Sequence, residues 1–474
     1  MKDLNSKIRF GVMASCDTME WWQQETIKLL IDNGIELVMT ACDIDVDSAR
    51  NLDFILSFKS EKIDENIISS PKNGVWEFHF QAFHDFMNKI PKSEVILRQL
   101  TDETSKCLII KRLNLDTILH SYKAHRDRLY KEAEILPLLA CKDLIVNGKL
   151  KTELSGSPII DYPKPNMLQM IKYHLVSIWR RIVFHFNYFC RQEDWNVGFC
   201  MMPIADFINR ENRESLDIQW LKPSKSEYFA DPFVITTKDD TYLFFEWFSN
   251  KNGKADIAMA KQSEGFAKYH KTARFPEHHS FPYIFEYQDV IYCIPEANKT
   301  DKISLYRLEN DKLIFDTDLL QGRFVDSVLH HHKDGKWYLF TTPQKQSHTH
   351  LLIYLADDLR GPYSEHFYNP VKVDCHDSRM AGMILNIDGN LIRPAQNSTR
   401  HYGESVTLNK VIELNEYQYI EKEIKEIKPD KNWAYNKGIH TINGNDFMTV
   451  FDAKRFTFTL RGFIQQIRQK FEIC

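Results

Sequence analysis

Acidic side chains recur at matching places in the second half of the chain. Asp231 and Asp326 stand at the start of apolar segments, and Glu246 and Glu296 stand at the end of the segments that follow. A carboxyl group is costly to bury unless it is paired or used. Two carboxyl groups in different environments can supply the general acid and general base of glycosidic chemistry. We therefore take Asp231, Glu296 and Asp326 as catalytic candidates and Glu246 as a substrate-binding candidate.

Basic and amide side chains occupy comparable positions. Arg379 and His440 lie beside the starts of two further segments of this kind, and His279 lies just before another. Arg393 and Gln396 stand near the end of a fourth segment. These side chains can bind a polar, hydroxyl-rich or anionic ligand, or they can tune the carboxyl groups. We expect them to bind substrate, although strand-end residues can also be satisfied by the backbone alone.

The segments that must position these side chains form an internal repeat. Each copy has an apolar strand, a polar turn and a second, aromatic-rich strand. The copies are residues 230–246, 280–296, 325–341, 379–396 and 438–453. A hairpin repeat of this period is typical of a β-propeller, in which the first strand of each blade lines a central channel. Five copies predict an all-β, five-bladed β-propeller over residues 223–454, with the candidates gathered at one channel mouth.

Residues 1–145 show a different pattern, in which apolar strands alternate with helices. KIRFGVMAS, IELVMTAC, DFILSF and GVWEFHF have the length and character of buried strands, and a helix ends near Gly34. This order predicts an α/β domain with a parallel, Rossmann-like sheet. The dinucleotide motif G-x-G-x-x-G is absent, so we expect no dinucleotide.

Two further segments are predicted to contain amphipathic helices. The connector, residues 146–222, holds a strongly apolar helix that carries Lys172, Arg180 and Arg181. The basic tail, residues 455–474, follows the propeller. Either helix could pack against the domains, or it could lie on an anionic membrane surface.

Composition narrows the classes of function. A net charge of −4 over 474 residues argues against a nucleic-acid binder. The start of the chain lacks a long apolar segment, and no run of about 18 apolar residues occurs. We therefore expect a reduced, cytoplasmic protein, at most peripheral at the inner face of the membrane. We predict no metal site, because no C-x-x-C pair occurs and neighbouring residues of the run His330–His332 point to opposite strand faces.

The ordered motifs of the second half resemble a known family. ADPF, FFE, SFPYIF, IPE, RMAG, RPAQ, YGES and GIHT follow one another between about residues 195 and 453. They resemble the N-terminal module of plant glucosamine inositolphosphorylceramide transferases and related bacterial proteins of surface-polysaccharide loci. That module is similar to the five-bladed propellers of arabinanase- and fructosidase-type glycoside hydrolases, which implies catalytic roles for Asp231, Asp326 and Glu296. In the plant proteins a separate glycosyltransferase domain follows, so the propeller could catalyse or only bind glycan.

The first region resembles the folate-dependent formyltransferases. The segment PKNGVWEFH is similar to the one that leads to that family's catalytic histidine, which would be His79 here. Glu77 stands where the family has Asn, and Thr104 or Ser105 stands where it has Asp. The resemblance therefore implies a degenerate site with a structural or sugar-binding role, and formyl-tetrahydrofolate is not expected as a cofactor.

Together these observations give one leading hypothesis. We expect a carbohydrate-active enzyme of cell-surface polysaccharide or glycolipid biosynthesis that transfers a sugar to a sugar or glycolipid substrate. A nucleotide-sugar donor is compatible with this chemistry, and no other cofactor is predicted. The alternatives are a glycoside hydrolase that uses the same carboxyl groups, a non-catalytic glycan-binding protein, and a sugar N-formyltransferase.

Overall fold

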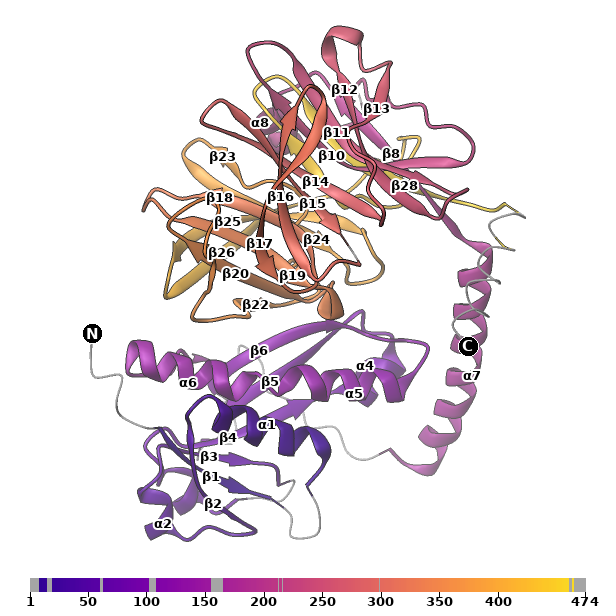
Figure 1. The fold of residues 1–474 in the computed structure, drawn as a ribbon. Helices are drawn as coiled ribbons and strands as arrows, with labels where there is room; N and C mark the ends of the chain where they lie inside the picture. Colours follow the sequence, from indigo (N-terminus) through magenta and orange to yellow (C-terminus); the bar gives the residue numbers. More distant parts are fainter. Residues whose placement is uncertain are drawn as a thin grey trace. The chain divides into compact units, whose positions relative to one another are not determined.

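The computed structural model divides the chain into two units, Met1–Val183 and Phe184–Cys474 (Figure 1). It describes residues 8–14, 19–59, 63–101, 108–154, 165–211, 213–214, 216–297, 299–459 and 463. Thr104, one position of the expected formyltransferase-like site, lies outside these residues, as does most of the predicted tail helix.

The first unit is built on a seven-stranded sheet with the order β2–β1–β3–β4–β5–β6–β7. Its strands are β1 (Arg9–Met13), β2 (Glu36–Ala41), β3 (Phe54–Ser57), β4 (Val75–Phe80), β5 (Lys92–Gln99), β6 (Leu108–Asp116) and β7 (Glu153–Leu154). The four apolar runs predicted as strands are β1 to β4, and they pair in parallel. All four side chains of β3 are buried, as expected for a strand covered on both faces.

The remaining strands of this sheet are antiparallel. The prediction of a parallel sheet is therefore wrong for β5 to β7, and the sheet is mixed. Only eight residues separate β5 from β6. A parallel crossover needs a dozen or more residues, so a link this short forces antiparallel pairing.

Helices accompany this sheet. They are α1 (Trp21–Asp32), α2 (Val46–Arg50), α3 (Glu65–Ile68), α4 (Ala82–Asn88), α5 (Tyr122–Ala133) and α6 (Leu136–Asn147). The helix α1 begins where the Gln23 side chain accepts the backbone N–H of Glu20, at 2.9 Å. It ends before Gly34, whose φ of 82° suits a residue without a Cβ.

The second unit contains five antiparallel sheets, blades 1 to 5. Blade 1 comprises β10 (Glu227–Thr236), β11 (Thr241–Ser249), β12 (Lys254–Lys261) and β13 (Tyr269–Lys271), and blade 2 comprises β14 (His279–Tyr287), β15 (Val290–Ala297), β16 (Lys302–Glu309) and β17 (Lys312–Gln321). Blade 3 comprises β18 (Phe324–His331), β19 (Trp337–Pro343), β20 (His350–Ala356), β21 (Ser364–Glu365) and β22 (Lys372–Val373), and blade 4 comprises β23 (Leu385–Ile387), β24 (Asn390–Asn397), β25 (Ser405–Asn415) and β26 (Gln418–Ile427). Blade 5 comprises β27 (Ile442–Gly444), β28 (Thr449–Thr457), β8 (Gln192–Cys200) and β9 (Gln219–Trp220). The five predicted hairpins are the first two strands of these blades.

Blade 5 joins the beginning of the propeller to its end. β8 precedes blade 1 in the sequence, and it pairs antiparallel with β28 from the C-terminal side. β8 and β9 lie within the segment predicted as connector, so the propeller begins before residue 223. The predicted tail helix does not begin at residue 455, because Arg455 belongs to β28 and donates to Asp194 at 2.8 Å.

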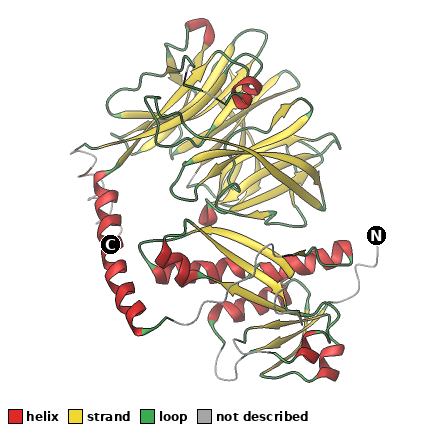
Figure 2. Ribbon diagram, turned by 180° about the vertical axis from the view of Figure 1, so that it is seen from behind, coloured by secondary structure: helices red, strands yellow, loops and turns green. Residues whose placement is uncertain are grey.

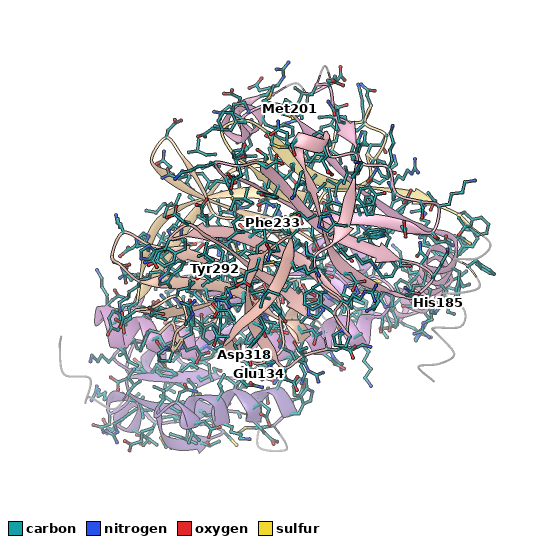
Figure 3. All side chains as sticks on the ribbon, turned by 45° about the horizontal axis from the view of Figure 1, so that its top comes forward. Glu134, His185, Met201, Phe233, Tyr292 and Asp318 are labelled. Atoms are coloured by element: carbon teal, nitrogen blue, oxygen red, sulfur yellow. The ribbon has the colours of Figure 1, made fainter. Side chains whose placement is uncertain are left out.

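Hydrogen bonds cross every junction between neighbouring blades. They join Phe281 to Asp231, Asp326 to Glu296, Gln396 to Asp326, Ile442 to Ala381, and Thr441 to Asp231. The five sheets therefore close into a ring, as the propeller hypothesis predicted. Apolar side chains fill the spaces between sheets: Phe233 is fully buried within the propeller, whereas Met201 lies at its edge (Figure 3).

One continuous helix, α7 (Met167–Cys190), follows the first sheet and precedes β8 (Figure 2). It is the helix predicted in the connector. Among the described residues, no helix combines the length and the apolar character needed to cross a membrane. Among the described cysteines, Cys141, Cys190, Cys200 and Cys293 form no disulfide, whereas Cys42 is disulfide-bonded. The expectation of a reduced, cytoplasmic protein stays a prediction.

Candidate active site at the propeller axis

The first strands of blades 1, 2 and 3 carry the same irregularity. Their pairing register shifts around Asp231, Phe281 and Asp326. These three residues have positive φ angles of 49°, 42° and 49°. Left-handed backbone is strained for residues other than glycine, and such strain persists where surrounding contacts hold it, often at functional sites.

Each of these residues donates its backbone N–H to a carboxylate. The N–H of Asp231 donates to Asp452 at 3.0 Å, that of Phe281 to Asp231 at 3.1 Å, and that of Asp326 to Glu296 at 3.3 Å. Every acceptor comes from the neighbouring blade. The repeat thus brings acids from four blades together around one axis.

His440 lies between two carboxylates of this cluster. Its Nε2 is 3.4 Å from Asp231, and its Nδ1 is 2.6 Å from Asp452. Asp231 also accepts the Thr441 hydroxyl at 2.8 Å. Burial disfavours the charged imidazolium, but Asp452 and Asp231 outweigh that effect and raise the pKa of His440. His440 therefore serves as a cation for both acids.

Asp231 forms an acid pair with Glu246. Burial raises the pKa of Asp231 to about 6, although the His440 charge opposes the rise. Burial and the charge of Asp231 hold the pKa of Glu246 well above its usual range. The raised pKa favours the protonated form of Glu246, next to an aspartate with a pKa of about 6, and acid–base catalysis requires such a division of roles.

A second acid pair joins blades 2 and 3. Asp326 accepts the Gln396 amide at 2.6 Å and Arg379 Nη2 at 3.2 Å. Arg379 Nη2 also lies 3.9 Å from Glu296, whose side chain is 10% exposed. Burial and the charge of Asp326 raise the pKa of Glu296 well above its usual range. This pair matches the first, with arginine in place of histidine.

Aromatic side chains and one lysine enclose the cluster. The Trp195 ring lies 4.2 Å from that of His440, and Arg379 lies 5.4 Å from the Tyr402 ring centre. Lys454 Nζ lies 5.0 Å over Trp195 and 2.6 Å from Glu193. These contacts fix the cations and limit the access of water to the acids.

A pocket of about 820 Å³ opens on the propeller beside this cluster. Tyr228, the Tyr435 ring and Glu193 are among its lining residues, together with Asn250 and Arg455. Burial and the charges of Glu246 and Asp231 raise the pKa of Tyr228, so this residue of the pocket wall lies within electrostatic reach of the acids. The volume and the mixed aromatic and polar lining suit a small polar ligand such as a sugar.

Two predicted binding residues lie outside the cluster. Arg393 is fully buried and makes two bonds to Glu421, at 2.6 and 2.7 Å. His279 stacks on Phe275 with ring centres 3.8 Å apart. Its neighbour His278 is closer to the acids, with Nε2 3.8 Å from Glu246. Of the propeller candidates, the structure gathers Asp231, Glu246, Glu296, Asp326, Arg379, Gln396 and His440.

In the described part of the expected formyltransferase-like site, an arginine neutralises the acid. Glu77 accepts Arg98 Nε at 2.8 Å across the antiparallel β4–β5 pair. His79 is 5% exposed, and its Nε2 lies 3.0 Å from the Gln81 amide. Glu77 is thus held by its own cation, and formyl transfer stays an untested alternative.

One group in the cluster has donor atoms that could hold a metal ion. Asp231, His440 and Asp452 each offer one atom, and these atoms lie within 4.8 Å of one another. The same atoms bind each other, since His440 bridges the two carboxylates. The sequence prediction of no metal site remains a prediction.

Sequence reasoning missed several members of the cluster. Asp452 and Lys454 lie on β28, the second strand of the last repeat. Trp195 and Tyr402 belong to DWNVGF and YGES, motifs within the resemblance that received no role. The signal was available, because the repeat aligns β28 with the strands that carry Glu246 and Glu296.

Comparison with known proteins agrees with the sequence resemblance. A rice protein named glucosamine inositolphosphorylceramide transferase 1 (Oryza sativa subsp. japonica) is 30% identical over 250 residues, 48% of this chain and 34% of the rice protein. Its Arabidopsis thaliana namesake is 29% identical over 229 residues, 46% of this chain and 29% of that protein. The chain thus spans about a third of the length of these curated relatives.

Solved structures of glycoside hydrolases are also similar. A thermostable family-43 glycoside hydrolase matches with a TM-score of 0.34 and 16% identity, over 43% of this chain and 77% of that one. An α-L-arabinofuranosidase from Podospora anserina matches with a TM-score of 0.35 and 10% identity, over 50% and 94%.

The family match covers the propeller. The family described as "Glucosamine inositolphosphorylceramide transferase 1, N-terminal" matches residues 219–457, which is half of the chain and includes every acid of the cluster. The protein therefore belongs to the family of the N-terminal region of glucosamine inositolphosphorylceramide transferase 1.

Proposed function

We propose that this protein transfers a sugar in the biosynthesis of a cell-surface glycan or glycolipid, with the chemistry at the propeller axis. The observation that carries the proposal is the presence of two buried acid pairs, in which a glutamic acid with a raised pKa adjoins an aspartate. A sugar whose reacting carbon lies at this cluster would meet an acid and a base with different pKa values.

Asp231 and Glu296 have the clearest roles in this proposal. Asp231 is mostly ionised at neutral pH and would accept the proton of the attacking hydroxyl group. The raised pKa of Glu296 favours its protonated form, which would donate a proton to the departing oxygen. Asp326 and Arg379 would hold Glu296 in place.

The relatives' name suggests the substrates. It combines glucosamine with inositolphosphorylceramide. We therefore propose a nucleotide-activated amino sugar as donor and a phosphoinositol-bearing lipid as acceptor. Arg393 does not support binding of the donor phosphate, because Glu421 already neutralises it. Arg455 is likewise paired, with Asp194, so Lys222, which lines the pocket, is the better candidate.

Incubation with radiolabelled nucleotide sugars tests the proposal. We expect transfer of label to a phosphoinositol lipid, and a loss of about 10²- to 10⁴-fold in kcat for Asp231→Asn and for Glu296→Gln. Asp239→Asn, which changes an exposed aspartate in a turn of the same blade, is the matched control and should keep full activity.

Two outcomes would favour the alternatives. Release of the leaving group from an aryl glycoside without any acceptor would indicate glycoside hydrolysis. Glycan binding that survives Asp231→Asn, without turnover of any donor, would indicate a glycan-binding protein.

A further inference from the structure

The outer face of α7 is a continuous apolar stripe. Leu168, Leu175, Ile178, Ile182 and Phe186 are 76%, 65%, 60%, 55% and 65% exposed. Spacings of three and four residues place such side chains on one side of a helix. Twelve of the exposed large apolar side chains in the described chain lie on this one helix. An exposed apolar patch of this size marks an interaction surface.

The opposite face of α7 is already occupied. Tyr173 packs against Phe86 of α4 with ring centres 5.9 Å apart. The buried Arg180 donates to the backbone carbonyls of Phe86 and Met87, the latter at 3.2 Å, and lies 4.9 Å over the Phe86 ring. These bonds fix the rotation of the helix. The apolar stripe therefore cannot turn inward without leaving Arg180 unpaired.

The charges on α7 indicate what covers the stripe. Lys172 and Arg181 are exposed, and residues 167–190 contain no Asp or Glu. Two copies paired through this face would bring these cations together without an acid to neutralise them. An anionic lipid surface supplies both an apolar layer and negative charge.

We propose that α7 binds the surface of an anionic membrane leaflet, lying in its plane with the apolar stripe inserted at the boundary of headgroups and acyl chains. The helix is about 36 Å long at 1.5 Å per residue. Lys172 and Arg181 bind lipid phosphates while the apolar side chains leave water. This inference does not rest on the proposed function, because membrane binding is measured without turnover.

Co-sedimentation of the full chain with vesicles tests the proposal. The vesicles are phosphatidylcholine alone or phosphatidylcholine mixed with phosphatidylglycerol. We expect binding to the anionic vesicles that weakens as salt is raised. Ile178→Glu should weaken it by at least about tenfold, because a buried apolar side chain is lost and a charge is added. Ile412→Glu is the matched control, since Ile412 is 59% exposed on β25.

The cationic part is tested separately. Arg181→Gln should weaken binding to anionic vesicles by about fivefold and leave any binding to neutral vesicles unchanged. Equal effects of Ile178→Glu and Ile412→Glu would overturn the proposal, as would failure of the unmodified chain to bind anionic vesicles. A dimer in sedimentation equilibrium that Ile178→Glu makes monomeric, without vesicle binding, would assign the stripe to a second copy instead.

Discussion

Two clusters of buried charge in the propeller differ in their balance of acids and cations. Where blades 3 and 4 meet, Arg393 binds Glu421, and Lys372 binds Glu421 and Asp377 at 2.7 and 2.6 Å. This cluster has two cations for two carboxylates. At the axis, two cations face five carboxyl groups, and Lys454, a third cation of the cluster, is bound to Glu193. The cations are Arg379 and His440, and the acids are Asp231, Glu246, Glu296, Asp326 and Asp452.

The difference in balance moves the pKa of similar side chains in opposite directions. At Glu421, burial opposes ionisation, but Arg393 and Lys372 lower its pKa to about 2. At Glu246, burial and the neighbouring acids raise the pKa. A balanced cluster holds fixed charges and stabilises structure, whereas an excess of acids keeps protons that a reaction can use.

The largest expected effect comes from replacing a glutamate by glutamine, once in each cluster. Glu421→Gln leaves Arg393 and Lys372 buried with a partner missing, and it should lower the free energy of unfolding by about 3–5 kcal/mol. Glu246→Gln replaces an acid whose raised pKa favours the protonated form by a neutral isostere, and it should change that free energy by less than about 1 kcal/mol. Urea unfolding of both variants measures the contrast. Equal losses would show that the axial acids are also structural.

Stability should also depend on pH in opposite ways for the two clusters. The native pKa of Glu421, about 2, lies below its ordinary value of about 4.3, so its contribution is complete above about pH 4 and is lost as pH falls through 2. This loss amounts to about 3 kcal/mol. The native pKa of Asp231, about 6, is raised, so stability should fall as pH rises from about 4 to about 6.

Two variants distinguish the contributions of Glu421 and Asp231 to the pH dependence of stability. Unfolding of Glu421→Gln between pH 2 and 5 should lack the acid-side loss. Unfolding of Asp231→Asn should show a smaller decline between about pH 4 and 6, to which the raised pKa values of Glu246 and Glu296 also contribute. If Asp231→Asn keeps the full decline, another axial group, such as Glu246, carries it.

The sequence allowed the propeller and most of the axial cluster to be predicted. Hairpins recur with polar turns, and Asp231 and Asp326 occupy equivalent positions in two copies, so symmetry alone brings them together. Arg393 was misplaced by the same reasoning, because it lies three residues from Gln396 on β24. Residues an odd number apart on a strand point to opposite faces, so only one of them can face the axis.

Other features could not be derived from local patterns. Blade 5 takes β8 from a distant part of the chain, and only the closure of the ring reveals this pairing. The antiparallel β5–β6 pairing depends on the short link between these strands, and the apolar pattern of β5 does not show the direction of its partner.

His440 offers a smaller test of the axial cluster. Its positive charge opposes the rise in the pKa of Asp231. His440→Gln should therefore raise that pKa further, and the acid limb of the kcat/KM profile for sugar transfer should move to higher pH. Carboxyl NMR of labelled Asp231 gives the same pKa without turnover. An unmoved acid limb, alongside a moved NMR titration, would show that Asp231 is not the base.

The smallest expected effect extends the comparison to the first unit. Glu77 and Arg98 form a balanced pair of one acid and one cation, with side chains 19% and 15% exposed. A pair with one acid and one cation should stabilise structure, as the balanced cluster around Glu421 does, but exposure to water screens its charges. Glu77→Gln should lower the free energy of unfolding by about 1 kcal/mol and leave sugar transfer unchanged. Calorimetric titration with a formyl-folate analogue should give no heat with the unmodified chain or with Glu77→Gln, because Arg98 already binds the Glu77 carboxylate near His79. Binding that His79→Ala abolishes would instead show that the first unit keeps formyltransferase chemistry.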